Sequence, residues 1–154
     1  MKKQRNVTIG FIGLFILFQV IQSCGASNEE LKISALEHFN RGNKYYKNDN
    51  LKAAVDEYKR AIALYPGQEN FHYNLGLVYY SLVLYENAID SYWEAIKLKP
   101  DFAEAWYNLA LAFNKVDETE KAFMALDKYK KLNIKKGNAD LSENKQKKED
   151  KSRN

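Results

Sequence analysis

A 34-residue spacing recurs through the middle of the chain and constrains its fold more than any other feature. Two clear copies of one residue pattern are followed by a third unit in the same register, which contains Trp106, Leu109, Ala110, Phe113 and Ala122. A small residue, an aromatic residue, two alanines and a proline at fixed offsets indicate a chain built from stacked copies of one structural unit. The identical pairs one period apart are Gly42 and Gly76, Tyr45 and Tyr79, Ala54 and Ala88, Tyr58 and Tyr92, Ala61 and Ala95, and Pro66 and Pro100.

The repeated pattern closely resembles the tetratricopeptide repeat, whose signature is W-x2-L-G-x2-Y followed by Ala, an aromatic residue and Pro. The second unit, residues 69–102, matches this signature best, and the first, residues 35–68, has Arg41 where Leu is usual. The resemblance implies an all-α fold, a right-handed solenoid of three helix-turn-helix repeats. The third unit, residues 103–136, keeps the Trp and Leu of the signature and departs from it later, with Leu126, Tyr129 and Ile134.

The small residues of the pattern indicate close contact between helices. Gly42 and Gly76 fall inside predicted helices, where glycine costs about 1 kcal/mol relative to alanine. Such a repeated cost is best explained by a neighbouring helix that leaves no room for a larger side chain. Ala110 occupies the same position in the third unit. The small residues expected to face these three positions are Ala54, Ala88 and Ala122.

Two prolines punctuate the units. Pro66 and Pro100 lack the backbone N–H that a helix interior needs, so each is expected to end its unit. Asp49 and Asn50 are expected to supply the turn inside the first unit. The predicted helices cover residues 29–47, 50–64, 68–82, 85–98, 101–115 and 117–134.

The N-terminus has the order of features that is typical of a secretory signal peptide. Residues 1–5 are rich in basic side chains, and residues 7–21 contain no charged residue. This apolar stretch is short for a membrane span, which needs about 20 residues. The four residues that end at Cys24 resemble a bacterial lipobox, although Gln22 is bulkier than the usual residue there. We therefore predict a lipoprotein signal peptide at residues 1–23.

Cys24 is the only cysteine in the chain, so it has no partner for an internal disulfide. A single cysteine at the end of a signal peptide indicates acylation by diacylglycerol and palmitate, and several acyl chains would hold the protein firmly on a membrane. The alternatives are a chance cysteine beside an ordinary cleavage site, or an uncleaved anchor. Residues 24–34 are expected to form a short linker and the start of the first helix.

The basic balance of the chain belongs largely to this targeting segment. The whole chain carries 24 basic and 20 acidic residues, a formal net charge of +4. Three of the basic residues and none of the acidic ones lie in residues 1–23, so the remainder has 21 basic and 20 acidic residues and a charge of +1. No basic stripe therefore supports nucleic-acid binding.

The C-terminal segment is highly charged. Residues 135–154 hold seven Lys or Arg and four Asp or Glu, and almost no apolar side chain. Such a segment cannot bury enough surface to offset the entropy of ordering it. We predict a charged disordered tail at residues 137–154, solvated rather than bound to anionic lipid or peptidoglycan. The lysine-rich second helix of the third unit is then expected to close the stack.

No cluster of residues predicts catalysis. His38 and His72 occupy one repeat position, which Trp106 fills in the third unit, so this position indicates helix packing rather than a catalytic base. The sequence has no glycine-rich phosphate loop, metal-ligand cluster or Ser/His/Asp arrangement. We expect no enzymatic activity, no cofactor, no metal and no small-molecule substrate. The carboxylates are expected to be scattered over helix surfaces, for example at Asp56, Glu57, Asp90 and Glu94.

The resemblance also implies an interaction surface, because the first helix of each tetratricopeptide pair lines a concave groove in which ligands usually lie. Aromatic rings offer a large contact area at low entropic cost, and Asn side chains can pair with a peptide backbone. The alternative is that these residues, which are common in such repeats, serve packing alone. Carried over by position, the groove residues are Phe39, Asn43 and Tyr46, then Tyr73, Asn74, Leu77 and Tyr80, then Tyr107, Asn108, Leu111 and Asn114.

Chaperone-binding members of the family grip a C-terminal carboxylate with Lys and Arg beside Asn. Asn43 and Asn74 match positions of that clamp. Phe39, however, replaces its first Lys, and Glu104 and Asn108 stand where the other basic residues would be. An apolar peptide or a partner helix therefore fits this groove better than a carboxylate.

These features together predict a non-catalytic adaptor of the bacterial cell envelope. It would be lipid-anchored at the outer membrane or at the periplasmic face of the inner membrane. Its groove would bind another envelope protein or a peptide, in the assembly of an envelope complex. The alternative is an accessory or regulatory subunit of a cell-wall or secretion enzyme, or an enzyme itself.

Overall fold

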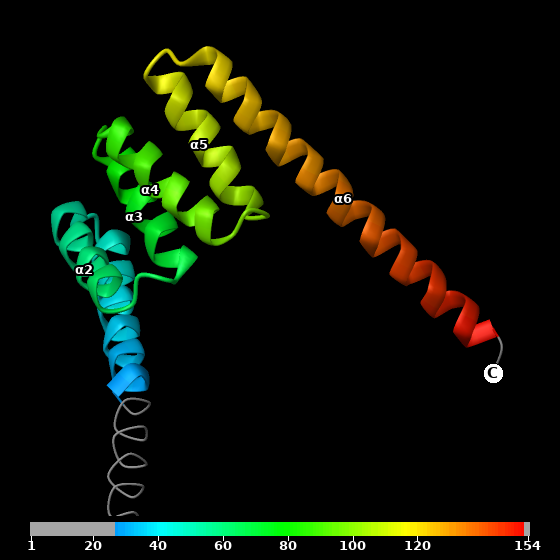
Figure 1. Cartoon of the computed structure of the whole chain (residues 1–154), viewed down its shortest axis with the longest axis horizontal. Helices are drawn as coiled ribbons and strands as arrows, with labels where there is room; N and C mark the ends of the chain where they lie inside the picture. The colour runs from blue at the N-terminus through cyan, green and yellow to red at the C-terminus, as the bar shows by residue number, and fades with distance from the viewer. Residues whose placement is uncertain (1–26, 153–154) are drawn as a thin grey trace, which may run out of the picture.

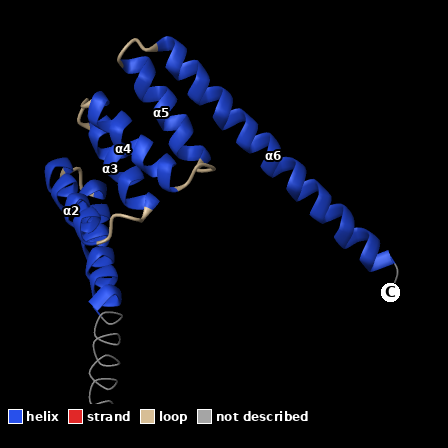
Figure 2. Ribbon diagram, viewed as in Figure 1, coloured by secondary structure: helices blue, strands red, loops and turns tan. Residues whose placement is uncertain are grey.

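The computed structural model describes the backbone of residues 27–152 and the side chains of residues 27–137, and the elements within this range are helices (Figures 1 and 2). The predicted signal peptide and Cys24 lie outside the described residues. None of the described helices is both long and apolar enough to cross a membrane. The helices span residues 27–47, Leu51–Leu64 (α2), Glu69–Ser81 (α3), Tyr85–Leu98 (α4), Ala103–Lys115 (α5) and Thr119–Ser152 (α6).

The helices form three successive pairs that match the three sequence units. The helix 27–47 packs on α2, α3 packs on α4, and α5 packs on α6. Contacts of α2 with α3 and of α4 with α5 join the pairs into a stack. The predicted all-α solenoid of three helix-turn-helix repeats is confirmed, and all helix ends except the last agree with the predicted ranges to within two residues.

The last helix differs from the prediction. Residues 137–154 were expected to be disordered, but α6 continues as a helix to Ser152 and runs past the end of α5 (Figure 1). The other units end at a proline, whereas the third has Ile134 at that position, so nothing interrupts the backbone hydrogen bonds. The segment beyond it is rich in Lys, which favours helix, and it extends a helix already nucleated by packing on α5.

The two prolines act as predicted. Helices α2 and α4 end at Leu64 and Leu98, two residues before Pro66 and Pro100. The residue before a proline is pushed out of the helical region, so the chain turns there and enters the next unit.

Each pair turns on a residue in the left-handed backbone region. Asp49, Val83 and Asp117 have φ angles of 58°, 63° and 60° and stand one period apart. The amide after each of them closes the turn by donating to a carbonyl five residues earlier, over 2.9 to 3.0 Å. This geometry tolerates Asp, but it is strained for a β-branched residue such as Val83.

The repeated glycines face tyrosine rings, and not the alanines that we expected opposite them. A Cβ added at Gly42 would lie 2.6 Å from Cε1 of Tyr58, and one added at Gly76 would lie 2.6 Å from Cε1 of Tyr92. Both tyrosines are completely buried. In the third unit Ala110 stands in place of the glycine and Leu126 in place of the tyrosine. One helix therefore carries a Cβ there, and the other carries no aromatic ring.

Candidate interaction surface

The first helices of the three units lie next to one another and carry all the predicted groove residues. Tyr46 Oη donates to Ser81 Oγ over 3.5 Å, which links the helix 27–47 to α3. Asn108 Nδ2 donates to Tyr73 Oη over 2.8 Å, which links α5 to α3. The structure therefore brings the predicted residues of all three units onto one continuous face, which we call the inner face. It consists of Phe39, Asn43, Tyr46, Tyr73, Asn74, Leu77, Tyr80, Tyr107, Asn108, Leu111 and Asn114.

Phe39 and Tyr73 of the inner face pack closely against aromatic rings of the core. The ring centroid of Phe39 lies 5.6 Å from that of Tyr58, on the partner helix of its own unit. The centroid of Tyr73 lies 5.9 Å from that of Tyr92 and 4.8 Å from that of Phe102. Phe39 and Tyr73 are half-buried against the core, so their removal would leave cavities. They support the inner face rather than extend from it.

The asparagines of the inner face are held in place by the protein itself. Asn43 Oδ1 accepts a hydrogen bond from Tyr58 Oη over 2.7 Å, and Asn74 Nδ2 donates to the carbonyl of Asn70 over 2.8 Å. Asn108 is already bonded to α3 through its amide nitrogen. Asn43 Nδ2 and Asn108 Oδ1 form no hydrogen bond with the described residues, so each side chain offers one oriented group to a partner.

The open part of the inner face lies on α3 and α5. Tyr107 is 41% exposed, and Asn114 is exposed further along the same helix. Leu77, Tyr80 and Leu111 are half-buried, with apolar edges at the surface. A bound segment would therefore meet a rim of Tyr107 and Asn114 above an apolar floor.

The inner face is electrically neutral, since none of its residues is acidic or basic. Burial raises the pKa of Tyr73, and the nearby Glu104 carboxylate raises it further, although the hydrogen bond from Asn108 acts in the opposite direction. The Tyr73 hydroxyl therefore stays protonated at neutral pH. Such a surface favours uncharged side chains and peptide groups over ions.

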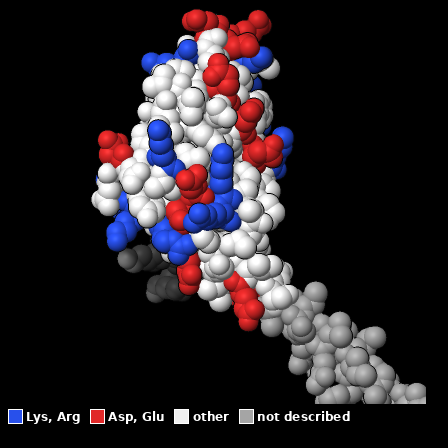
Figure 3. Space-filling view, turned by 90° about the vertical axis from the view of Figure 1, so that its left-hand side faces the viewer, with Lys and Arg blue, Asp and Glu red and all other residues white. Residues whose placement is uncertain are grey.

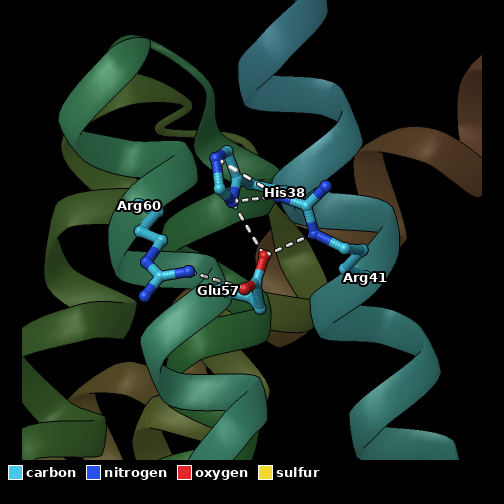
Figure 4. A network of polar contacts seen from close by, with 4 residues as sticks. All are labelled: His38, Arg41, Glu57 and Arg60. Atoms are coloured by element: carbon cyan, nitrogen blue, oxygen red, sulfur yellow. Dashed lines mark hydrogen bonds and ion pairs between the residues drawn. The ribbon is translucent and has the colours of Figure 1, made fainter.

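A network of polar contacts around one buried carboxylate in the first unit was not predicted from the sequence (Figure 4). Glu57 on α2 is 8% exposed, and its Oε2 accepts from His38 Nδ1 at 2.7 Å and from Arg41 Nε at 2.8 Å. Its Oε1 accepts from Arg60 Nη1 at 3.0 Å. Burial alone would raise the pKa of Glu57, but the hydrogen bonds and positive charges of Arg41 and His38 outweigh it and lower this pKa. The expectation that Glu57 is a scattered surface carboxylate is wrong.

The signal for this network lies in two coincident departures from the repeat. Arg41 and Glu57 both belong to the first unit, and their side chains meet. A charge inside a repeat is costly unless it is paired, so the two departures read together would have predicted the pair. In the second and third units the position of Arg41 holds Leu75 and Leu109, and the position of Glu57 holds Ser91 and Ala125.

Charged residues also cover the outer side of the first helix. Glu37, Arg41 and Lys44 are exposed there, and no helix among the described residues precedes them. Figure 3, which views the molecule from the side of α2, shows basic and acidic side chains next to one another on this face. The first unit therefore ends the stack with a polar surface, as the terminal repeat of an array requires. The residues at these positions in the later units are buried: Phe71 and Ala105, Leu75 and Leu109, and Val78 and Ala112.

The histidine position has a structural use in each unit. His72 Nε2 donates to the carbonyl of Pro66 over 2.9 Å, and Trp106 Nε1 donates to the carbonyl of Pro100 over 2.9 Å. His38 contacts Glu57 instead. Within the described part of the chain, no group of three or more His, Cys, Asp or Glu side chains could hold a metal ion.

Known proteins share this architecture. A family model described as TPR repeat matches residues 42–83 and 85–116. The crystal structure of MamA is similar with a TM-score of 0.67 and 31% sequence identity, and the match covers 68% of this chain and 61% of that one. The second TPR of Spaghetti (RPAP3) bound to HSP90 peptide SRMEEVD is similar with a TM-score of 0.67 and 20% identity, over 70% of this chain and 98% of that one. No curated protein matches the sequence.

The paired helices, the left-handed turns and the glycine–tyrosine contacts define a helical-repeat protein. With the family match and these structural relatives, the chain belongs to the tetratricopeptide repeat proteins.

Proposed function

We propose that this protein is a non-catalytic adaptor that binds an extended peptide or a helix of another protein on its inner face. The observation that carries the proposal is the continuous, uncharged and aromatic surface that the first helices of all three units share. Its side chains are held by hydrogen bonds such as those of Asn43 and Asn108, so little conformational entropy is lost on binding.

The inner face also selects the kind of ligand. One structural relative is bound to the peptide SRMEEVD, which is acidic near its end. In this chain the positions of a carboxylate clamp hold the half-buried ring of Phe39 and the carboxylate of Glu104. A negatively charged peptide end would be repelled there, so the ligand is an apolar segment with free backbone hydrogen-bonding groups.

A photo-crosslinking experiment tests this binding site. A benzophenone amino acid replaces Tyr107 in the full-length chain, expressed in its native cells, because Tyr107 is exposed and its ring contacts the half-buried Tyr129 of α6 rather than a core residue. Tyr73 is unsuitable, since its ring packs against Tyr92 and Phe102. We expect a dominant light-dependent adduct with one envelope protein, which mass spectrometry then identifies.

The matched control places the same amino acid at Val83, which is 64% exposed on the turn between α3 and α4 and lies off the inner face. The adduct should be absent there. The same adducts at both positions, or no adduct at Tyr107, would contradict the proposal. An adduct with an enzyme would identify the chain as an accessory subunit.

We further propose that Cys24 anchors the adaptor by lipid in the bacterial envelope, at the outer membrane or the periplasmic face of the inner membrane. The support is the order of basic, apolar and small residues before this single cysteine. The variant Cys24→Ser should lose labelling by radioactive palmitate and keep its signal peptide. Unchanged labelling, or a mature N-terminus at another residue, would refute the anchor.

A further inference from the structure

Side chains of α4, α5 and α6 line an apolar groove that contains no residue of the inner face. Its volume is about 520 Å³, and it is lined by Trp93 of α4, by Trp106 and Phe113 of α5, and by Phe123 and Met124 of α6. Phe123 and Met124 are 70% and 66% exposed, although large apolar side chains are usually covered. We call this site the outer groove.

The wall of the outer groove is positively charged. Lys121, Lys128 and Lys131 line it, against the single acid Asp127. Lys131 pairs with Asp127 over 2.6 Å, and Lys121 pairs with Glu118 over 2.9 Å, but these are exposed pairs within one helix and are weak. Lys128 forms no ion pair with the described residues. The groove therefore suits an apolar segment that carries acidic residues.

The opposite end of the molecule presents such a segment. On the helix 27–47, Ile33 and Leu36 are 52% and 42% exposed. They share a stripe with Glu29 and Glu37, because residues three, four and seven apart lie on one side of a helix. We call these four residues the N-terminal stripe. Its isoleucine and leucine match the apolar lining of the outer groove, and its two glutamates supply negative charge opposite the groove lysines, although Glu29 also forms a weak exposed pair with Lys32 over 3.9 Å.

We propose that the N-terminal stripe of one copy of this chain docks in the outer groove of a second copy. Ile33 and Leu36 pack against Trp93 and Met124, and the two glutamates face Lys128 and Lys131. The contact is head-to-tail, since it joins two different surfaces. Each dimer still has one free stripe and one free groove, so further copies can add.

Sedimentation velocity on the full-length chain in detergent tests the proposal through two complementary variants. The stripe variant is Ile33→Glu with Leu36→Glu, and the groove variant is Met124→Glu with Lys128→Glu. We expect the average mass of the wild type to rise with concentration and that of either variant alone to stay low. An equal mixture of the two variants should form a dimer and nothing larger, because the mixture contains only one functional pair of surfaces.

Two further variants serve as controls. Val83→Asn removes an exposed apolar side chain away from both surfaces and should associate like the wild type. Tyr107→Ala alters the inner face and should do the same, which separates this inference from the proposed adaptor function. Every variant keeps residues 1–26, so association through that segment would be equal in all of them.

Tryptophan fluorescence gives an independent readout, because the two tryptophans of the chain both line the outer groove. Adding the groove variant, which supplies an intact stripe, should shift the emission of the stripe variant, whose own groove is intact, away from the sum of the two separate spectra. A chain that carries the substitutions of both variants should bind at least tenfold more weakly.

Three results would overturn the inference. They are a wild type that stays monomeric up to about 1 mM, a stripe or groove variant that still associates like the wild type, and a mixture of these two variants whose emission equals the sum of the separate spectra. An emission shift caused only by vesicles of anionic phosphatidylglycerol would assign the groove to a membrane surface instead.

Discussion

The first and second units place a tyrosine against a glycine in the same way, yet they treat its hydroxyl differently. In both units a Cβ on the glycine would lie 2.6 Å from the ring. Tyr58 Oη donates to Asn43 Oδ1 over 2.7 Å, whereas the buried Tyr92 Oη has no hydrogen-bond partner among the described residues. The reason is one substitution, because Leu77 stands one period after Asn43.

The two units also differ at the contact between their helices. The first unit joins Arg41 to Glu57, where the second has Leu75 and Ser91. Among the described residues no further helix packs on the outer side of the first unit, while the second lies between two others. The comparison teaches that the small and aromatic signature residues set the helix packing, while the residues between them adapt each unit to its place in the stack.

The largest expected effect tests what the two units share. Gly76→Leu should lower the free energy of unfolding by about 3 kcal/mol, because overpacking of a dense core typically costs about 1–3 kcal/mol and here even the Cβ collides with Tyr92. Gly42→Leu should cost a similar amount against Tyr58. Urea denaturation monitored by circular dichroism measures both.

A rescue variant controls for a general intolerance of substitution. The third unit accommodates Ala110 opposite Leu126, so Gly76→Ala combined with Tyr92→Leu should be more stable than Gly76→Ala alone. If the double variant is no more stable than Gly76→Ala, the tyrosine ring is not what limits the size of the residue at Gly76.

The second prediction tests the polar network of the first unit. Glu57→Gln should destabilise the protein by about 1–2 kcal/mol at neutral pH, since hydrogen bonds to a charged group are stronger than neutral ones. Ser91→Ala, at the equivalent position of the second unit, loses only a bond to the carbonyl of Asn87 and should cost less.

The stability that Glu57 contributes is expected to depend on pH. The pKa of Glu57 is lower in the folded protein than its ordinary value of 4.5. The stability that its ionised form contributes is therefore complete above pH 4.5 and is lost as the pH falls through the lower, folded pKa. The difference between wild type and Glu57→Gln should shrink from pH 5 towards about pH 3. A difference that is constant over this range would contradict the pairing.

The sequence predicted the fold well because the repeat fixes it at several positions at once. Gly42, Gly76 and the prolines set the helix contacts and the helix ends without reference to the rest of the chain. The inner face was only partly predictable, since the spacing identifies its residues but does not show that Phe39 and Tyr73 are used in packing. The extent of α6 was not predicted, because the charge of residues 137–154 was given more weight than the absence of a proline at the end of the third unit.

The third prediction tests the difference between the two tyrosine hydroxyls. Tyr58→Phe should lower the free energy of unfolding by about 1 kcal/mol, because it leaves Asn43 Oδ1 without its donor. Tyr92→Phe should leave stability unchanged or raise it, since it removes a buried hydroxyl that lacks a partner. Equal losses in the two variants, measured by urea denaturation, would show that Tyr92 Oη is satisfied in solution.

The smallest expected effect concerns the turns. Val83 has a φ angle of 63°, in a region where β-branched residues are strained, whereas Asp49 and Asp117 occupy the same position in the other units. Val83→Asn should therefore raise the free energy of unfolding by up to about 1 kcal/mol, because Asn adopts the left-handed conformation more readily. Val83→Ile is the matched control, since it keeps the β-branch and should give no gain. If both variants stabilise the protein equally, the gain comes from the surface and not from the backbone of the turn.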